Sequence, residues 1–178
     1  MDAGHITDLF GSPIAGDMER SAVFSACRRY RYALWRRWGP GPYCMFVGLN
    51  PSTADELLDD RTILRCVGFA RSWGFSALCM TNLFAFRATD PEVMKAADDP
   101  VGPDNDMHVR HLAQGAGLVV AAWGVDGTFR GRHLVAREML PGLHYLRLTR
   151  DGHPGHPLYL PADLKPTPWT TQLIEPSA

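Results

Sequence analysis

Short apolar runs alternate with segments of helical periodicity along most of this chain, and this alternation restricts the folds open to it. Four runs have the length and the bounding turn residues of buried strands: residues 43–49, 76–81, 118–123 and 143–148. Three segments place apolar residues on one helical face: 61–73, 104–114 and 128–140. Continuously apolar strands that alternate with helices form parallel sheets covered on both faces. We therefore expect a three-layer α/β fold with a four-stranded parallel sheet flanked by helices.

The segments before the first apolar run are less regular. Residues 1–20 carry Gly, Pro and Asp without a period, so we expect an irregular N-terminal segment. Residues 21–38 fit both strand alternation and helical spacing, and they end at Gly39-Pro40-Gly41-Pro42. Because no linker composition or internal repeat divides the chain, we expect a single domain over residues 1–178.

Composition and charge exclude several classes of protein. With 46% hydrophobic residues in 178, the chain can bury a core and is not expected to be disordered. No apolar run approaches the length of about 20 residues that crosses a membrane. The start Met1-Asp2-Ala3-Gly4-His5 is no secretory signal, and the four cysteines form no C-x-x-C pair, so we expect a cytoplasmic protein with reduced, mostly buried thiols. The formal net charge of −1 disfavours tight non-specific binding of a polyanion.

Polar residues collect after the predicted strands. In open α/β sheets, ligands bind outside the carboxyl ends of the strands. The candidate site residues there are Gly48, Asn50, Pro51, Ser52 and Asp55 after the first strand, Asn82, Phe84 and Arg87 after the second, Trp123 after the third, and His153 and His156 after the fourth. Their convergence on one edge predicts a pocket for a planar, polar ligand that is anionic or resembles a nucleobase.

Several of these residues also have a purely structural interpretation. Asn50, Pro51 and Ser52 are compatible with an Asx-turn. Asn82 could satisfy backbone groups of the following loop, and Trp123 could belong to the core. The sequence alone leaves these alternatives open.

Arginine supplies almost all of the positive charge, since only Lys95 and Lys165 are lysines among 18 basic residues. This bias fits phosphate recognition, but it also fits a GC-rich genome. One dense group could touch phosphate or form a solvated strand face: Arg28, Arg29, Arg31, Arg36 and Arg37.

Carboxylates near the first strand suggest a different chemistry. Asp59 or Asp60 can cap the helix predicted over 61–73. Together with Asp55 and His156 they could instead support a metal-assisted hydrolase. The histidines of the last loop fit no closed zinc pattern, so no metal site and no cofactor are expected.

Five longer runs carry a family resemblance. They are DDRTILRCVGFARSWGF, NLFAFRATDP, DPVGPDND, AAWG and GHPLYL, and they lie within residues 30–160. They resemble an uncharacterised bacterial and phage family, domain of unknown function 1643. This resemblance implies no activity.

The order VGLNPS, TNLFAFRA, VVAAWG and HP is similar to the motif order of the uracil-DNA glycosylase superfamily. The resemblance implies a uracil-DNA-glycosylase-like fold. It also implies that Asn50 positions a water for attack at a sugar C1′ and that Asn82 reads the edge of a base. A histidine, His153 or His156, would then stabilise the charge on the departing base. Ser52 departs from the first motif, where the superfamily has glycine.

We interpret the chain first as a base-recognising hydrolase of an N-glycosidic bond in a nucleic acid or nucleotide. The alternatives are a non-catalytic module that binds a nucleobase or nucleotide, and the metal-assisted hydrolase. A nucleic acid or a nucleotide is the expected partner. No membrane association and no obligate protein partner are expected.

Overall fold

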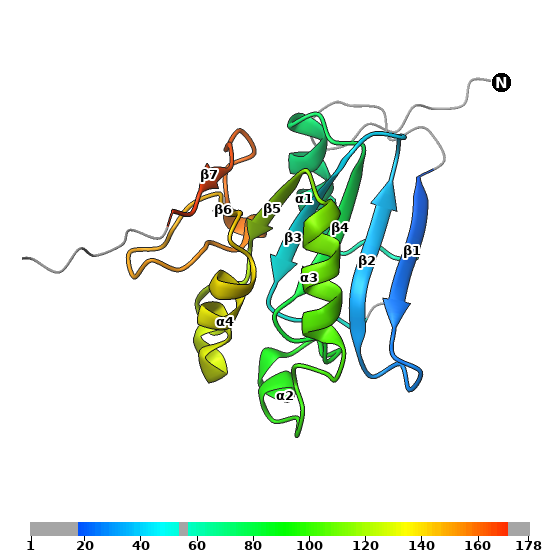
Figure 1. Cartoon of the computed structure of the whole chain (residues 1–178), viewed down its shortest axis with the longest axis vertical. Coiled ribbons are helices and arrows are strands. Elements are labelled where there is room, and N and C mark those ends of the chain that lie inside the picture. The colour runs from blue at the N-terminus through cyan, green and yellow to red at the C-terminus, as the bar shows by residue number, and fades with distance from the viewer. Residues whose placement is uncertain (1–17, 54–56, 171–178) are drawn as a thin grey trace, which may run out of the picture.

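A mixed sheet forms the centre of the computed structural model, which describes residues 18–53 and 57–170 (Figure 1). Its strands are β1 (Glu19–Phe24), β2 (Arg31–Arg37), β3 (Tyr43–Gly48), β4 (Ala77–Asn82), β5 (Leu118–Ala121), β6 (Leu143–Tyr145) and β7 (Thr167–Pro168). Their order across the sheet is β1-β2-β4-β3-β5-β6-β7. The helices are α1 (Arg61–Ser72), α2 (Pro91–Lys95), α3 (Asn105–Gly115) and α4 (Arg132–Met139), with 3-10 turns η1 (Val125–Gly131) and η2 (Pro157–Tyr159).

The expected α/β architecture, with one sheet flanked by helices, is confirmed. The expected number of four strands is wrong, because the described residues form a sheet of seven strands. The four predicted strands are β3 to β6, and they pair in parallel as β4-β3-β5-β6. The hairpin of β1 and β2 adds to β4 in antiparallel orientation, and β7 adds to β6 in the same way. Residues 21–38, which the sequence left open, are therefore mainly strand. Glu19 and Arg20 already belong to β1, and residues 1–17 lie outside the described part.

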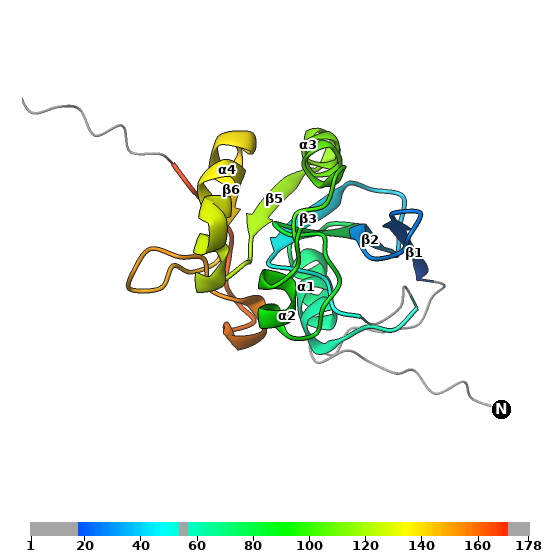
Figure 2. The same ribbon diagram turned by 90° about the horizontal axis from the view of Figure 1, so that it is seen from below.

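Both faces of the central strands are covered. Met45 and Val47 of β3 pack in one core with residues of α3 and α4. Cys44 and Phe46, which alternate with them, pack in a second core against α1. Figure 2 shows α3 and α1 on opposite sides of the sheet. This arrangement explains why the strands are apolar at consecutive positions.

The predicted helices over 61–73 and 104–114 agree with α1 and α3. The third predicted helix, 128–140, starts later, at Arg132. Arg130 has a φ of 50° and Gly131 a φ of 65°, and these left-handed conformations separate η1 from α4. The short helix α2 was not predicted.

The two aspartates before α1 have different roles. Asp60 is the N-cap, and its Oδ1 accepts a hydrogen bond of 2.9 Å from the backbone N–H of Ile63. Asp59 instead pairs with the buried Arg36 at 2.5 Å and with Arg20 at 3.2 Å. The alternative that the sequence left open is thus decided in favour of Asp60 as the cap.

The four cysteines are unpaired, and three of them, Cys44, Cys66 and Cys79, are buried. Burial raises the pKa of each of these three thiols. Cys27 is exposed. The expectation of mostly buried thiols is confirmed. None of the helices in the described ranges combines the length and apolar character needed to cross a bilayer.

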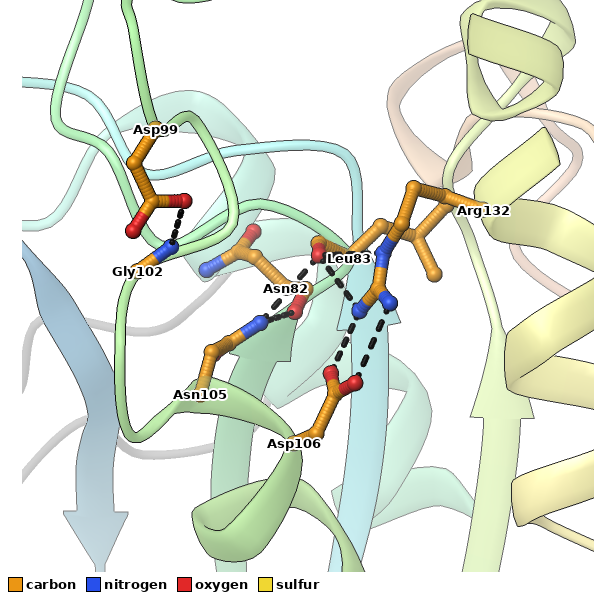
Figure 3. Close-up of polar contacts among 7 residues, drawn as sticks. All are labelled: Asn82, Leu83, Asp99, Gly102, Asn105, Asp106 and Arg132. Carbon is orange, nitrogen blue, oxygen red and sulfur yellow. Dashed lines mark hydrogen bonds and ion pairs between the residues drawn. The ribbon is translucent and has the colours of Figure 1, made fainter. Parts of the chain in front are cut away.

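A buried polar junction holds the end of β4 (Figure 3). The Asn105 side chain, at the start of α3, donates hydrogen bonds to the carbonyls of Asn82 at 3.0 Å and of Leu83 at 3.1 Å. From α4, Arg132 donates to the same Leu83 carbonyl at 3.0 and 3.2 Å. Arg132 also pairs with Asp106 of α3 at 2.5 Å. The junction therefore ties α3 and α4 to the backbone that carries Asn82.

Replacing Asn105 by Leu should lower the free energy of unfolding by about 2 kcal/mol or more, because one hydrogen bond to each buried carbonyl is lost. Urea denaturation measures this change. Gln114→Ala on the exposed face of the same helix is the matched control and should change stability by less than about 0.5 kcal/mol. Equal stabilities of the two variants would contradict a structural role for the junction.

Candidate functional site

A cavity of about 510 Å³ opens at the carboxyl ends of the parallel strands. Figure 2 views this edge of the sheet from below. The cavity lies among the segments that follow β3, β4, β5 and β6, and its volume is typical of a small-molecule site. Six predicted site residues line it: Gly48, Asn50, Ser52, Asn82, Trp123 and His156.

Asn82 is the most deeply placed polar group of this cavity, with 2% of its surface exposed. Its side-chain amide makes no hydrogen bond to any described residue, although the nitrogen is buried. The neighbouring Gly48 provides the space for this amide. A Cβ at Gly48 would lie 2.9 Å from the Asn82 Oδ1 and 2.7 Å from the Met80 methyl group. A buried amide without a partner is costly, which points to a ligand that satisfies it.

His156 also lines the cavity, from the segment after β6. Its Nδ1 accepts a hydrogen bond of 3.4 Å from the backbone N–H of Leu158. A neutral ring therefore carries its proton on Nε2. Burial lowers the pKa of His156 below its ordinary value of 6.5, and the nearby charge of Asp60 opposes this shift. His156 is thus a neutral hydrogen-bond donor at neutral pH.

His153 does not line the cavity. Its ring packs edge-on against His133, with 6.0 Å between the ring centroids. The β-bridge between Leu148 and Pro154 closes the loop that carries His153. The sequence could not distinguish His153 from His156, whereas the geometry brings only His156 to the cavity.

Asn50 lines the cavity, and the nitrogen of its side-chain amide is already hydrogen-bonded. Its Nδ2 donates to the Ala88 carbonyl at 2.8 Å and to the Pro51 carbonyl at 3.2 Å. No described residue donates to its Oδ1, which is an acceptor for a ligand or a water. Pro51 is buried, and its carbonyl accepts from the backbone N–H of Ala88 at 2.9 Å, so this residue shapes the loop. Ser52 lines the cavity next to them.

Trp123 forms one wall of the cavity and is 1% exposed. It is a core residue and a lining residue at once, so both interpretations of the sequence apply. Gly127 fits against its ring, because a Cβ there would lie 2.1 Å from Trp123 Cδ1.

Two other predicted ligand-binding residues lie away from the cavity. Phe84 is fully buried and packs against Phe129, with 5.7 Å between the ring centroids. Arg87 donates to the carbonyls of Arg28 at 3.0 Å and of Thr53 at 2.8 Å. Asp55 lies outside the described residues.

Arg31 lines the cavity and was not among the candidate site residues. It begins β2, which runs antiparallel to β4, so its amino end lies where β4 ends. Its backbone N–H donates to the carbonyl of Ala85 at 2.9 Å. In the sequence it stands out only as one of five arginines that could touch phosphate or form a solvated strand face. An antiparallel hairpin over residues 21–38 places it beside the carboxyl end of β4.

Helix α2 closes one side of the cavity. Its first residue, Pro91, is a lining residue. Lys95 at its other end pairs with Glu92 at 2.7 Å and with Asp126 at 2.9 Å. Because Asp126 follows β5 and also lines the cavity, this pair connects α2 to the opposite wall.

The metal-assisted alternative gains no support. In the ranges 18–53 and 57–170, no three His, Cys, Asp or Glu side chains converge as metal ligands would. Asp59 is engaged by two arginines, and Asp60 caps α1.

A family model matches residues 31–158, from β2 into η2. The chain belongs to that family, which is described as a protein of unknown function (DUF1643). The family resemblance expected over residues 30–160 is therefore confirmed. The match includes Arg31, Asn82 and His156. Neither the curated proteins nor the solved structures gave a match to this DUF1643 chain, so the resemblance to the uracil-DNA glycosylase superfamily has no support from these comparisons.

Gly48→Ala should displace the Asn82 amide, because the added methyl group would lie 2.9 Å from Oδ1 and 2.7 Å from Met80 Cε. We expect a loss of about 1–3 kcal/mol in the free energy of unfolding. Urea denaturation measures this loss. Gly142→Ala is the control, because a Cβ at Gly142 would have no atom within 4 Å apart from those of its chain neighbours. A fully stable Gly48→Ala protein would contradict the tight fit.

The lowered pKa of His156 makes stability depend on pH. The ring is neutral in both the folded and the unfolded states well above 6.5, so it contributes nothing there. As the pH falls below 6.5 the unfolded state takes up the proton first, and the folded state loses stability until its own lower pKa is passed. Urea denaturation at about pH 7.5 and about pH 5 should show a smaller loss for His156→Gln than for the unmodified protein. Equal losses would contradict the shift.

Proposed function

We propose that this chain binds a nucleobase in the cavity at the carboxyl edge of its sheet and hydrolyses the N-glycosidic bond of that base. The observation that carries the proposal is the buried, unsatisfied amide of Asn82, which lines one cavity together with Asn50 and His156. An amide presents a donor and an acceptor side by side, and base edges carry the complementary pair.

His156 suits a departing base. A neutral imidazole that donates through Nε2 gains little with an uncharged carbonyl, but its hydrogen bond strengthens as negative charge grows on the base oxygen. Such differential stabilisation lowers the barrier of the reaction. The hydrogen bond from Leu158 and the lowered pKa both support this neutral donor form.

Asn50 suits the attacking water. Its Nδ2 is fixed by the carbonyls of Ala88 and Pro51, so its Oδ1 has a defined position from which to accept a water hydrogen. The water oxygen bonds to C1′ while the C1′–N bond breaks and its electron pair goes to the base. One water proton ends on the base nitrogen, and the products are the free base and a sugar with a hydroxyl at C1′.

A second candidate is binding without hydrolysis. It is favoured by the state of the carboxylates that line the cavity, because Asp60 accepts from Ile63 and Asp126 from Lys95. Each of these two carboxylates therefore already serves a structural contact. In this candidate, Asn82 and His156 recognise the base and Asn50 only shapes the loop.

Base release distinguishes the two candidates. The purified protein is incubated with uracil-containing and modified DNA, with RNA, and with nucleosides and nucleotides, and free base is measured by mass spectrometry. We expect release by the unmodified protein, and a decrease of about 100-fold or more in Asn50→Ala and in His156→Ala.

His153→Ala is the matched control and should keep full activity, because this ring packs on His133 outside the cavity. Thermal unfolding checks that each variant folds. Binding of a base or nucleoside without release would select the second candidate. Neither binding nor release with any substrate would contradict both.

A further inference from the structure

We propose that the ligand of this cavity carries a phosphate group and that Arg31 binds it, so that the substrate class is a nucleoside phosphate. The base half of this statement rests on the proposed function. The phosphate half rests on Arg31, which the proposed reaction does not use.

Arg31 differs from the other buried arginines. Arg36 is fully buried and pairs with Asp59 at 2.5 Å, and Arg132 is 7% exposed and pairs with Asp106 at 2.5 Å. Arg31 is 5% exposed, yet its guanidinium makes no hydrogen bond and no ion pair with any residue in the described ranges. Two of these three buried guanidinium groups are therefore neutralised by a carboxylate. The third, which lines the cavity, has no carboxylate partner among the described residues.

An isolated buried cation is unfavourable, and burial lowers the pKa of Arg31 to about 10. Arg31 is nevertheless protonated at neutral pH. The charge of Asp60 favours this protonated form, and those of Arg87 and Arg36 oppose it. Since Asp60 is beyond ion-pair distance and caps α1, an external anion is the missing partner.

The surroundings of Arg31 favour phosphate as that anion. A guanidinium binds two phosphate oxygens with parallel hydrogen bonds. Thr62 of the first turn of α1 lines the same cavity, and a hydroxyl can donate a hydrogen bond to an anion. A nucleotide would place its base on Asn82 and its phosphate on Arg31 within one cavity.

The net charge favours a nucleotide over a nucleic acid. Proteins that hold a polynucleotide neutralise several phosphates with a basic surface. This chain has a formal net charge of −1 and a pI near 6.6, and its identified anion site is a single buried guanidinium.

The test compares nucleosides with their 5′-monophosphates, together with inorganic phosphate and a short single-stranded oligonucleotide, by calorimetry and thermal unfolding. The unmodified protein should bind the monophosphate about tenfold or more tightly than the matching nucleoside. In Arg31→Gln this preference should disappear, and without ligand this variant should be at least as stable as the unmodified protein, because an unpaired buried charge is removed. Arg31→Lys should keep part of the preference.

Arg36→Gln is the matched control, with an equally buried arginine on the same strand that has a carboxylate partner. It should unfold at a lower temperature and keep the phosphate preference. A preference that survives in Arg31→Gln, or a nucleoside that binds as tightly as its monophosphate, would overturn the phosphate site and leave the proposed function standing.

The remaining outcomes separate the two proposals. Arg31-dependent binding of inorganic phosphate, with no added affinity from any base, would retain the anion site and overturn the base-binding function. An oligonucleotide that binds tenfold or more tightly than every mononucleotide would overturn the nucleotide assignment in favour of a nucleic acid. Binding of none of these ligands would overturn both proposals.

Discussion

The hydrogen bonds to the carbonyls of Asn82 and Leu83 are the constraint on which the site depends. Where β4 leaves the sheet, these groups lose their strand partners in a buried place. Asn105 of α3 and Arg132 of α4 replace those partners. Two helices from later in the chain thereby fix one backbone position, and the Asn82 side chain points away from Arg132 (Figure 3). The same bonds therefore stabilise the fold and orient the deepest polar group of the cavity.

The contrast between satisfied and unsatisfied buried polar groups supports the proposed function. The buried Arg36 and Arg132 have carboxylate partners. In the cavity, the Asn82 amide, the Trp123 indole N–H and the Arg31 guanidinium have no partner among the described residues. Natural proteins depart from full satisfaction mainly at functional sites. The Asn82 amide and the Arg31 guanidinium differ in what they can bind, and the proposed ligand would meet them with its base and its phosphate.

The sequence predicted the parallel centre of the sheet and six of the residues that line the cavity for a physical reason. Strands buried on both faces are apolar throughout, so β3 to β5 were visible, and so were Asn82 and Trp123 at their ends. The edge hairpin carries arginines among its apolar residues, which obscured its period. Arg31 was named only within a group of five arginines, because its place at the beginning of a strand kept it out of the residues expected at the carboxyl edge. The choice of His156 over His153 depends on a β-bridge at Pro154, which no local pattern reveals.

The side-chain amide signal of Asn82 in a nitrogen-resolved NMR spectrum, assigned with the Asn82→Asp protein, tests base recognition most directly. We expect this signal to move on addition of a nucleoside or its monophosphate. The amide of Asn105, which already donates to two carbonyls, should move less. A ligand that binds in calorimetry while the Asn82 signal stays in place would contradict the claim that this amide recognises the base.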